Sequence, residues 1–119
     1  MYNMKSIYFI LFSMVFVIES HAVGTPSSFS GTIKQVVCHA KEVSSVCQVA
    51  VNGTPSANPC SAPGGWVYTF NGVELEGKNL LSILLAAQIS KSTVTIAGQG
   101  SCNLAASSED LRHVYIHTN

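Results

Sequence analysis

All four cysteines of this 119-residue chain lie between positions 38 and 102, and they restrict its fold more than any other feature. An even number of cysteines in an exported domain of this size predicts two disulfides. Four cysteines allow three pairings. We prefer Cys38–Cys47 with Cys60–Cys102, because the first pair flanks a polar stretch, 39–45, that resembles a hairpin loop. No Cys-x2-Cys pair is present, which disfavours a zinc site.

The first 22 residues have the three parts of a signal peptide. Lys5 supplies a positive charge, the uncharged apolar run 7–18 follows, and Ser20-His21-Ala22 places small residues at the −3 and −1 positions of a cleavage site. A helix of that apolar length is about 18 Å long, well short of the roughly 30 Å hydrocarbon core of a membrane. We therefore expect export, to the periplasm or out of the cell, and a single mature domain over 23–119.

Alternation and residue type predict five strands and one helix in the mature chain, after a flexible leader at 23–28. The expected strands are 29–38, 46–51, 66–70, 91–97 and 112–118. The helix, 78–89, falls between the third and fourth strands. This mainly β order is that of the OB-fold, a small five-stranded barrel, and a generic α+β sandwich is the alternative.

Two strands also have a predicted orientation. In the first strand, Ile33, Gln35 and Val37 alternate onto one face. In the last strand, Val114 and Ile116 are expected to point inward.

Composition and motifs argue against several function classes. Lys plus Arg and Asp plus Glu number six each, so the chain lacks the positive charge that nucleic acids and anionic membranes attract. The sequence contains no G-x-S-x-G, P-loop or H-E-x-x-H motif. His113 and His117 would lie about 13 Å apart on a strand, too far to share a metal. Glu74 and Glu76 precede the predicted helix, where their negative charges favour its N-terminus. Glu109-Asp110 is expected to be a solvated turn. We therefore expect no enzyme activity, cofactor or metal.

The side chains that remain fit a binding module. Hydroxyl, amide and aromatic groups bind sugars. Residues of these types are Ser30, Thr32, Gln99, Trp66, Tyr68 and Tyr115, of which Trp66 and Tyr68 also suit the core of a strand.

The predicted helix is apolar around most of its circumference. It is therefore either fully buried or presents a second apolar surface, with Leu80 or Leu84 outward, to other copies of the chain.

Short motifs resemble the B subunits of subtilase cytotoxin and of the pertussis-like (typhoid-type) toxins. The segment Phe29-Ser30-Gly31-Thr32-Ile33 resembles the start of their first strand, and the Cys47…Cys60 spacing is similar to a cysteine pair there. Segment 80–96, a helix running into a Val-x-Ile strand, also looks like theirs. A wider set of small exported proteins is similar too, through Gly-Lys-x-x-Leu-Ser-x-x-Leu-Ala-Ala at 77–87 and Gly-x-Gly-x-Cys at 98–102.

The toxin resemblance implies an OB-fold that assembles as a ring pentamer. In that family the helices line the ring, the sides bind sialylated cell-surface glycans, and a catalytic A subunit is the partner. The family's sugar-contacting serine falls on Ser30, whereas its tyrosine falls near Gly98, so that contact is missing here. The resemblance also implies a different cysteine pairing, Cys47–Cys60 with Cys38–Cys102.

Two functions therefore stay open. The first is an exported, disulfide-bonded binding module that resembles a toxin B subunit and binds cell-surface glycans as a ring oligomer. For this function we single out Ser30, Thr32 and Gln99 as glycan-binding residues. The second is an exported protein of structural or inhibitory role that shares only the fold.

Overall fold

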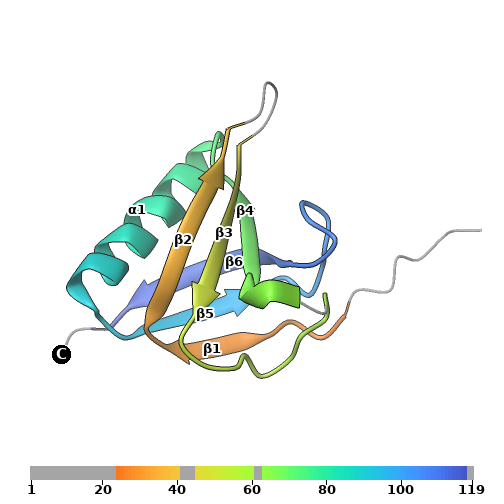
Figure 1. Cartoon of the computed structure of the whole chain (residues 1–119), viewed down its shortest axis with the longest axis horizontal. Helices are drawn as coiled ribbons and strands as arrows, with labels where there is room; N and C mark the ends of the chain where they lie inside the picture. Colours follow the sequence, from red (N-terminus) through yellow and green to blue (C-terminus); the bar gives the residue numbers. More distant parts are fainter. Residues whose placement is uncertain (1–23, 41–44, 61–62, 118–119) are drawn as a thin grey trace, which may run out of the picture.

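The computed structural model describes residues 24–40, 45–60 and 63–117, and the predicted signal peptide lies outside them. The elements are β1 (Ser28–Gly31), β2 (Ile33–His39), β3 (Val46–Val51), the short 3-10 helix η1 (Pro63–Gly65), β4 (Tyr68–Asn71), α1 (Leu75–Ser90), β5 (Val94–Gly98) and β6 (Glu109–Ile116). Figure 1 shows a curled sheet with α1 along one side. The prediction of a mainly β domain with one helix is confirmed. Within the described ranges, no helix is long and apolar enough to cross a membrane.

The strands form one sheet in the order β1-β5-β6-β4-β3-β2. Neighbouring strands are antiparallel except β4 and β6, which run in parallel with Tyr68 opposite Glu109. The two edge strands, β1 and β2, are consecutive in the chain and are separated only by Thr32. The sheet therefore curls until its edges meet at one point, which gives the half-barrel shape in Figure 1.

The sheet has six strands rather than the predicted five, because the first predicted strand changes partner in its middle. Residues 28–31 pair with β5, whereas residues 33–39 pair with β3. The other predicted elements are present, with ends displaced by at most three residues.

A bulge in β2 also changes which of its side chains face the core. Ile33 lies opposite Val51, but Gln35 lies opposite Ala50, so the register shifts at the residue between them. Beyond this point Val36 packs against the core while Gln35 is exposed. The predicted shared face of Ile33, Gln35 and Val37 is therefore wrong, since simple alternation does not survive a bulge.

The core fills the inside of the curled sheet and is closed by α1. From the strands it contains Phe29, Ile33, Cys47, Val49, Val51, Tyr68, Phe70, Val94, Ile96, Leu111 and Val114. From α1 it contains Leu84 and Ala87, with Leu80, Leu81 and Ile83 partly buried against it. Leu84 is fully buried and Leu80 half-buried, so neither is the outward position that the sequence suggested. Val114 is buried, as predicted. Ile116 lies opposite the buried Val94 in an inward position, but it is 40% exposed because β6 ends there.

The start of α1 depends on a close backbone approach at Gly77. A Cβ atom at this position would lie 1.6 Å from the carbonyl oxygen of Asn71, so no larger residue fits without movement of the backbone. The Asn71 side chain also accepts a hydrogen bond from the N–H of Val73 at 2.9 Å. These contacts fix the turn between β4 and α1, and the helix starts at Leu75, three residues earlier than predicted.

Both preferred disulfides are present. Cys38 and Cys47 are register partners on β2 and β3, with their Cα atoms 4.0 Å apart. Cys60 and Cys102 join two long loops, with a Cα–Cα distance of 5.8 Å. The pairing that the toxin resemblance implied, Cys47–Cys60 with Cys38–Cys102, is therefore wrong for this chain. The two disulfides are consistent with an exported protein.

Glu109 and Asp110 are buried at the start of β6, so the prediction of a solvated turn is wrong. Glu109 is 1% exposed, and its carboxylate accepts hydrogen bonds from the N–H of Ser27 at 3.1 Å, the hydroxyl of Ser27 at 2.5 Å and the N–H of Gly100 at 2.8 Å. The Ser27 hydroxyl also bonds the hydroxyl of Tyr68 at 2.8 Å. This network ties the segment before β1 to the barrel wall, so residue 27 is buried rather than part of a flexible leader.

Asp110 organises the loop that carries Cys102. Its carboxylate accepts hydrogen bonds from the hydroxyl of Ser101 at 2.6 Å and from the N–H groups of Asn103 at 3.0 Å and Leu104 at 3.1 Å. Within the described part of the chain, no buried side-chain polar atom lacks a hydrogen-bond partner. Both acidic residues thus accept hydrogen bonds that hold neighbouring segments of the fold together.

Candidate functional site

The outer face of β1, β5 and β6 presents a continuous polar and aromatic surface. Sheet register places Ser30, Thr95 and Tyr115 side by side in one row across the three strands. The adjacent register row is buried and consists of Phe29, Ile96 and Val114. Because side chains alternate along a strand, the first row points outward. We call this region the β1-β5-β6 surface.

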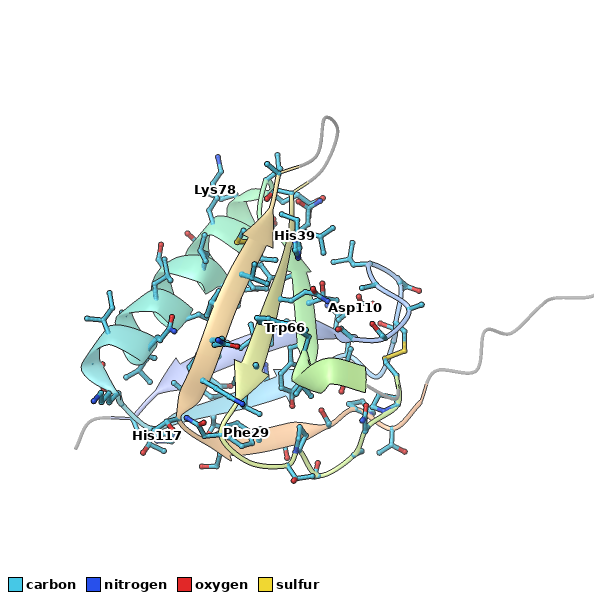
Figure 2. The ribbon with its side chains drawn as sticks, viewed as in Figure 1. Phe29, His39, Trp66, Lys78, Asp110 and His117 are labelled. Atoms are coloured by element: carbon cyan, nitrogen blue, oxygen red, sulfur yellow. A yellow bond between two sulfur atoms is a disulfide. The ribbon has the colours of Figure 1, made fainter. Side chains whose placement is uncertain are left out.

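A second row and one flanking residue complete this surface. Ser28, Ala97 and His113 are register partners in the neighbouring outward row. His117 follows two positions after Tyr115, and its Nε2 atom lies 2.7 Å from the hydroxyl oxygen of Thr95. Figure 2 shows His117 at the end of the sheet that lies nearest the last turn of α1. None of the side chains in these rows is a carboxylate.

The aromatic part of the surface is held in place by ring contact. The rings of His113 and Tyr115 have centroids 4.8 Å apart at an interplanar angle of 42°. Tyr115 nevertheless remains 56% exposed, so one face of a large amphipathic ring is open to solvent. An exposed aromatic ring beside hydroxyl groups that donate and accept hydrogen bonds can bind a ligand with alternating apolar and hydroxyl surfaces.

The three predicted glycan-binding residues differ in exposure and in their position on the sheet. Ser30 is exposed and lies on the β1-β5-β6 surface. Thr32 is half-buried between β1 and β2, where its hydroxyl accepts a hydrogen bond from the side chain of Asn52 at 2.9 Å. Gln99 lies beyond the end of β5, about 13 Å along the chain from Thr95, and its amide donates to the carbonyl of Leu111 at 3.0 Å.

The predicted aromatic residues also separate. Tyr68 is fully buried, so of its two suggested roles the structure supports the one in the core. Burial raises the pKa of Tyr68 above its ordinary value of 10.0; the charge of Glu109 adds to this, and the hydrogen bond with Ser27 opposes it. Trp66 is half-buried beside the start of β4 (Figure 2), and its carbonyl accepts a hydrogen bond from Ser108. Of the three aromatic residues, only Tyr115 lies in the same row as Ser30.

Two of the cavities lined by described residues lie apart from this surface. One, of about 410 Å³, lies between the first turns of α1 and the start of β6, and Glu74, Glu76 and Gln99 are among its lining residues. The other, of about 390 Å³, lies between the start of β2 and the end of α1. Among the described residues, no group of three or more His, Cys, Asp or Glu side chains could hold a metal ion.

Two residues of the surface were not selected as ligand-binding residues from the sequence, in which His113 was considered only as a possible metal ligand. Thr95 and His113 join the site only because β1, β5 and β6 are neighbours in the sheet. Their signal was the alternation of polar residues in the predicted strands 91–97 and 112–118, but nothing in the sequence placed those strands beside Ser30. Comparisons of the chain with models of known protein families, curated protein sequences and solved structures give no match.

Proposed function

We propose that the mature chain is an exported binding module of the OB type that binds saccharides on its β1-β5-β6 surface. The strand pairing supports the OB assignment. β1 and β2 act as the two halves of one bent strand, α1 lies between β4 and β5, and β4 runs parallel to β6. These features match a five-stranded Greek-key barrel whose first strand is counted twice.

The face that OB-folds commonly use for ligands is covered in this chain. That face corresponds to the outside of β3 and β4. Here Thr69 is fully buried, and the side chain of Gln48 donates to Ser108, whose hydroxyl donates in turn to the carbonyl of Trp66. The chain's own loops therefore occupy this face, and the β1-β5-β6 surface is the open alternative.

The row of Ser30, Thr95 and Tyr115 is the observation that carries the proposal. It combines two hydroxyl side chains with an exposed aromatic ring on adjacent strands. Ser30 is also the residue that the toxin resemblance assigns to sugar contact. Tyr115 can supply from β6 the aromatic contact that is missing near Gly98.

A surface this shallow binds one sugar weakly, so several copies are needed for useful avidity. The outward side of α1 is suited to contact between copies, because Leu75 is 71% exposed, Leu85 40% and Ile89 83%. We propose a homo-oligomer through this face, a ring pentamer by the toxin resemblance. Ile89→Glu should reduce the mass measured by light scattering to that of one chain. Ala106→Glu, which places the same charge on an exposed loop residue outside α1, should not.

A glycan array tests the proposed function directly. The mature protein should bind sialylated cell-surface glycans, and Ser30→Ala and Tyr115→Ala should both abolish that binding without changing thermal stability. Tyr115→Phe keeps the ring and should retain most of the binding, and Thr54→Ala, an exposed loop hydroxyl elsewhere, should bind as the unmodified protein does. Absence of binding to every glycan would favour the second function, an exported protein of structural or inhibitory role.

A further inference from the structure

The cavity between the start of β2 and the end of α1 concentrates positive charge. Its lining residues are Thr32, Ile33, Lys34, Asn52, Gln88 and Lys91. Two of these residues carry an ammonium group, and none carries a carboxylate. The described residues include four Lys or Arg side chains in all, at positions 34, 78, 91 and 112, so this one cavity holds half of them.

The neutral polar side chains of the cavity are held by hydrogen bonds to one another and to the backbone. Asn52 binds Thr32 twice, from its N–H to the carbonyl at 3.0 Å and from its side-chain amide to the hydroxyl at 2.9 Å. The amide of Gln88 donates to the carbonyl of Lys34 at 3.4 Å, which joins α1 to β2. Ile33 is buried and provides an apolar floor. The walls are therefore preorganised, and the two lysines are the adaptable parts.

The negative end of the α1 dipole opposes an anion here, but it is largely capped. The N–H groups of Lys91 and Ser92 donate to the last carbonyls of the helix, those of Gln88 and Ala87. The exposed acidic residues of α1 lie in and before its first turn, about 24 Å away along a 16-residue helix. Figure 2 shows Lys78, one turn into α1, at the end of the molecule opposite His117.

We propose that this cavity binds the anionic group of a small ligand, a carboxylate, sulfate or phosphate, between the ammonium groups of Lys34 and Lys91. Ammonium groups bind oxyanions through charge-assisted hydrogen bonds. A volume of about 390 Å³ is near the small end of the range for ligand sites, which suits a single acidic group with a compact body. The site does not depend on saccharide binding at the β1-β5-β6 surface.

The test is an NMR titration of the mature, disulfide-bonded protein with sodium sulfate, sodium phosphate, glucuronate and glucose. The three anions should shift the side-chain amide signals of Asn52 and Gln88 at millimolar concentration, and glucose should not. Binding of sulfate or phosphate alone would indicate a free oxyanion, and tighter binding of glucuronate an acidic sugar. Added sodium chloride should weaken binding, because the lysines are exposed and screened.

Charge-removing variants identify the residues. Lys34→Gln and Lys91→Gln should each weaken binding about three- to tenfold, and Lys91→Arg should restore it. Lys78→Gln, at the other end of α1, is the matched control, and Ser30→Ala separates this site from the saccharide surface. The proposal is wrong if no anion shifts the two amides. It is also wrong if Lys78→Gln or Ser30→Ala weakens anion binding as much as Lys34→Gln does.

Discussion

The replacement of Glu109 by alanine should remove a large part of the stability of this domain. In the folded protein its carboxylate is the acceptor for two backbone N–H groups, those of Ser27 and Gly100, and for the Ser27 hydroxyl. The carboxylate is 1% exposed, so water does not replace it without rearrangement. Alanine leaves both N–H groups without an acceptor, whereas the Ser27 hydroxyl keeps its bond to Tyr68.

The size of the effect follows from the donors that are lost. Each buried donor left unpaired costs about 1–3 kcal/mol, so two of them cost about 2–6 kcal/mol. A domain of this size has a total stability of about 5–15 kcal/mol. Glu109→Gln should cost less than Glu109→Ala, because its oxygen can accept from both N–H groups and its amide can donate to the Ser27 hydroxyl.

Urea unfolding of the mature, oxidised protein, followed by the fluorescence of its single tryptophan, measures this loss. Glu74→Ala is the matched control. Glu74 is exposed and makes no capping hydrogen bond through its side chain, so its removal should change stability by less than about 0.5 kcal/mol. A loss below about 1 kcal/mol for Glu109→Ala, or equal losses for the two variants, would refute the reasoning.

Three further predictions concern the same fold. Because burial raises the pKa of Tyr68, the folded state holds the phenolic proton more tightly than the unfolded state. The contribution of this proton to stability should be constant below about pH 10 and be lost above it, so urea midpoints should fall less in that range for Tyr68→Phe than for the unmodified protein. Gly77→Ala should cost about 2 kcal/mol or more, since its Cβ would collide with the Asn71 carbonyl, and should lower Tm by about 10 °C in a thermal melt. Cys102→Ser removes the disulfide with a sequence separation of 42 residues and should lower the free energy of unfolding in urea by about 4 kcal/mol. Cys38→Ser removes the disulfide with a separation of 9 residues and should lower it by about 3 kcal/mol; the reverse order would contradict this.

The element types and the Cys38–Cys47 disulfide could be predicted because they depend on local sequence. The Cys60–Cys102 disulfide joins residues 42 positions apart and followed as the remaining pair. Strand alternation around 46–51 and the Leu-rich helix are set by neighbouring residues. The Cys38–Cys47 pair followed from a hairpin whose loop was visible in the sequence. These signals need no knowledge of how the strands are arranged.

The errors arose where distant segments meet. The solvated-turn prediction for Glu109-Asp110 failed because the donors that bury these carboxylates come from residues 27 and 100–104. The bulge in β2 and the change of strand partner at Thr32 are likewise set by the closure of the sheet. The outward residues of α1 were misjudged for the same reason, since an apolar circumference does not show which side the sheet covers.

The candidate site was predicted only in part. Ser30 and Tyr115 were both selected by residue type, but only the register of β1, β5 and β6 places them in one row. Gln99 has a suitable amide, but it lies beyond the end of β5 and that amide donates to the carbonyl of Leu111. Residue type therefore identified the chemistry, and the sheet determined which residues share a surface.

The central claim is that saccharides bind on the β1-β5-β6 surface. The most direct measurement is an NMR titration of the isotope-labelled mature protein with sialyllactose, read at each backbone amide. We predict that the shifted signals gather at Ser30, Thr95 and Tyr115, and that Ser30→Ala removes the shifts. Absence of shifts at these three residues, or shifts that gather instead around the cavity beside Glu74 and Glu76, would contradict the claim.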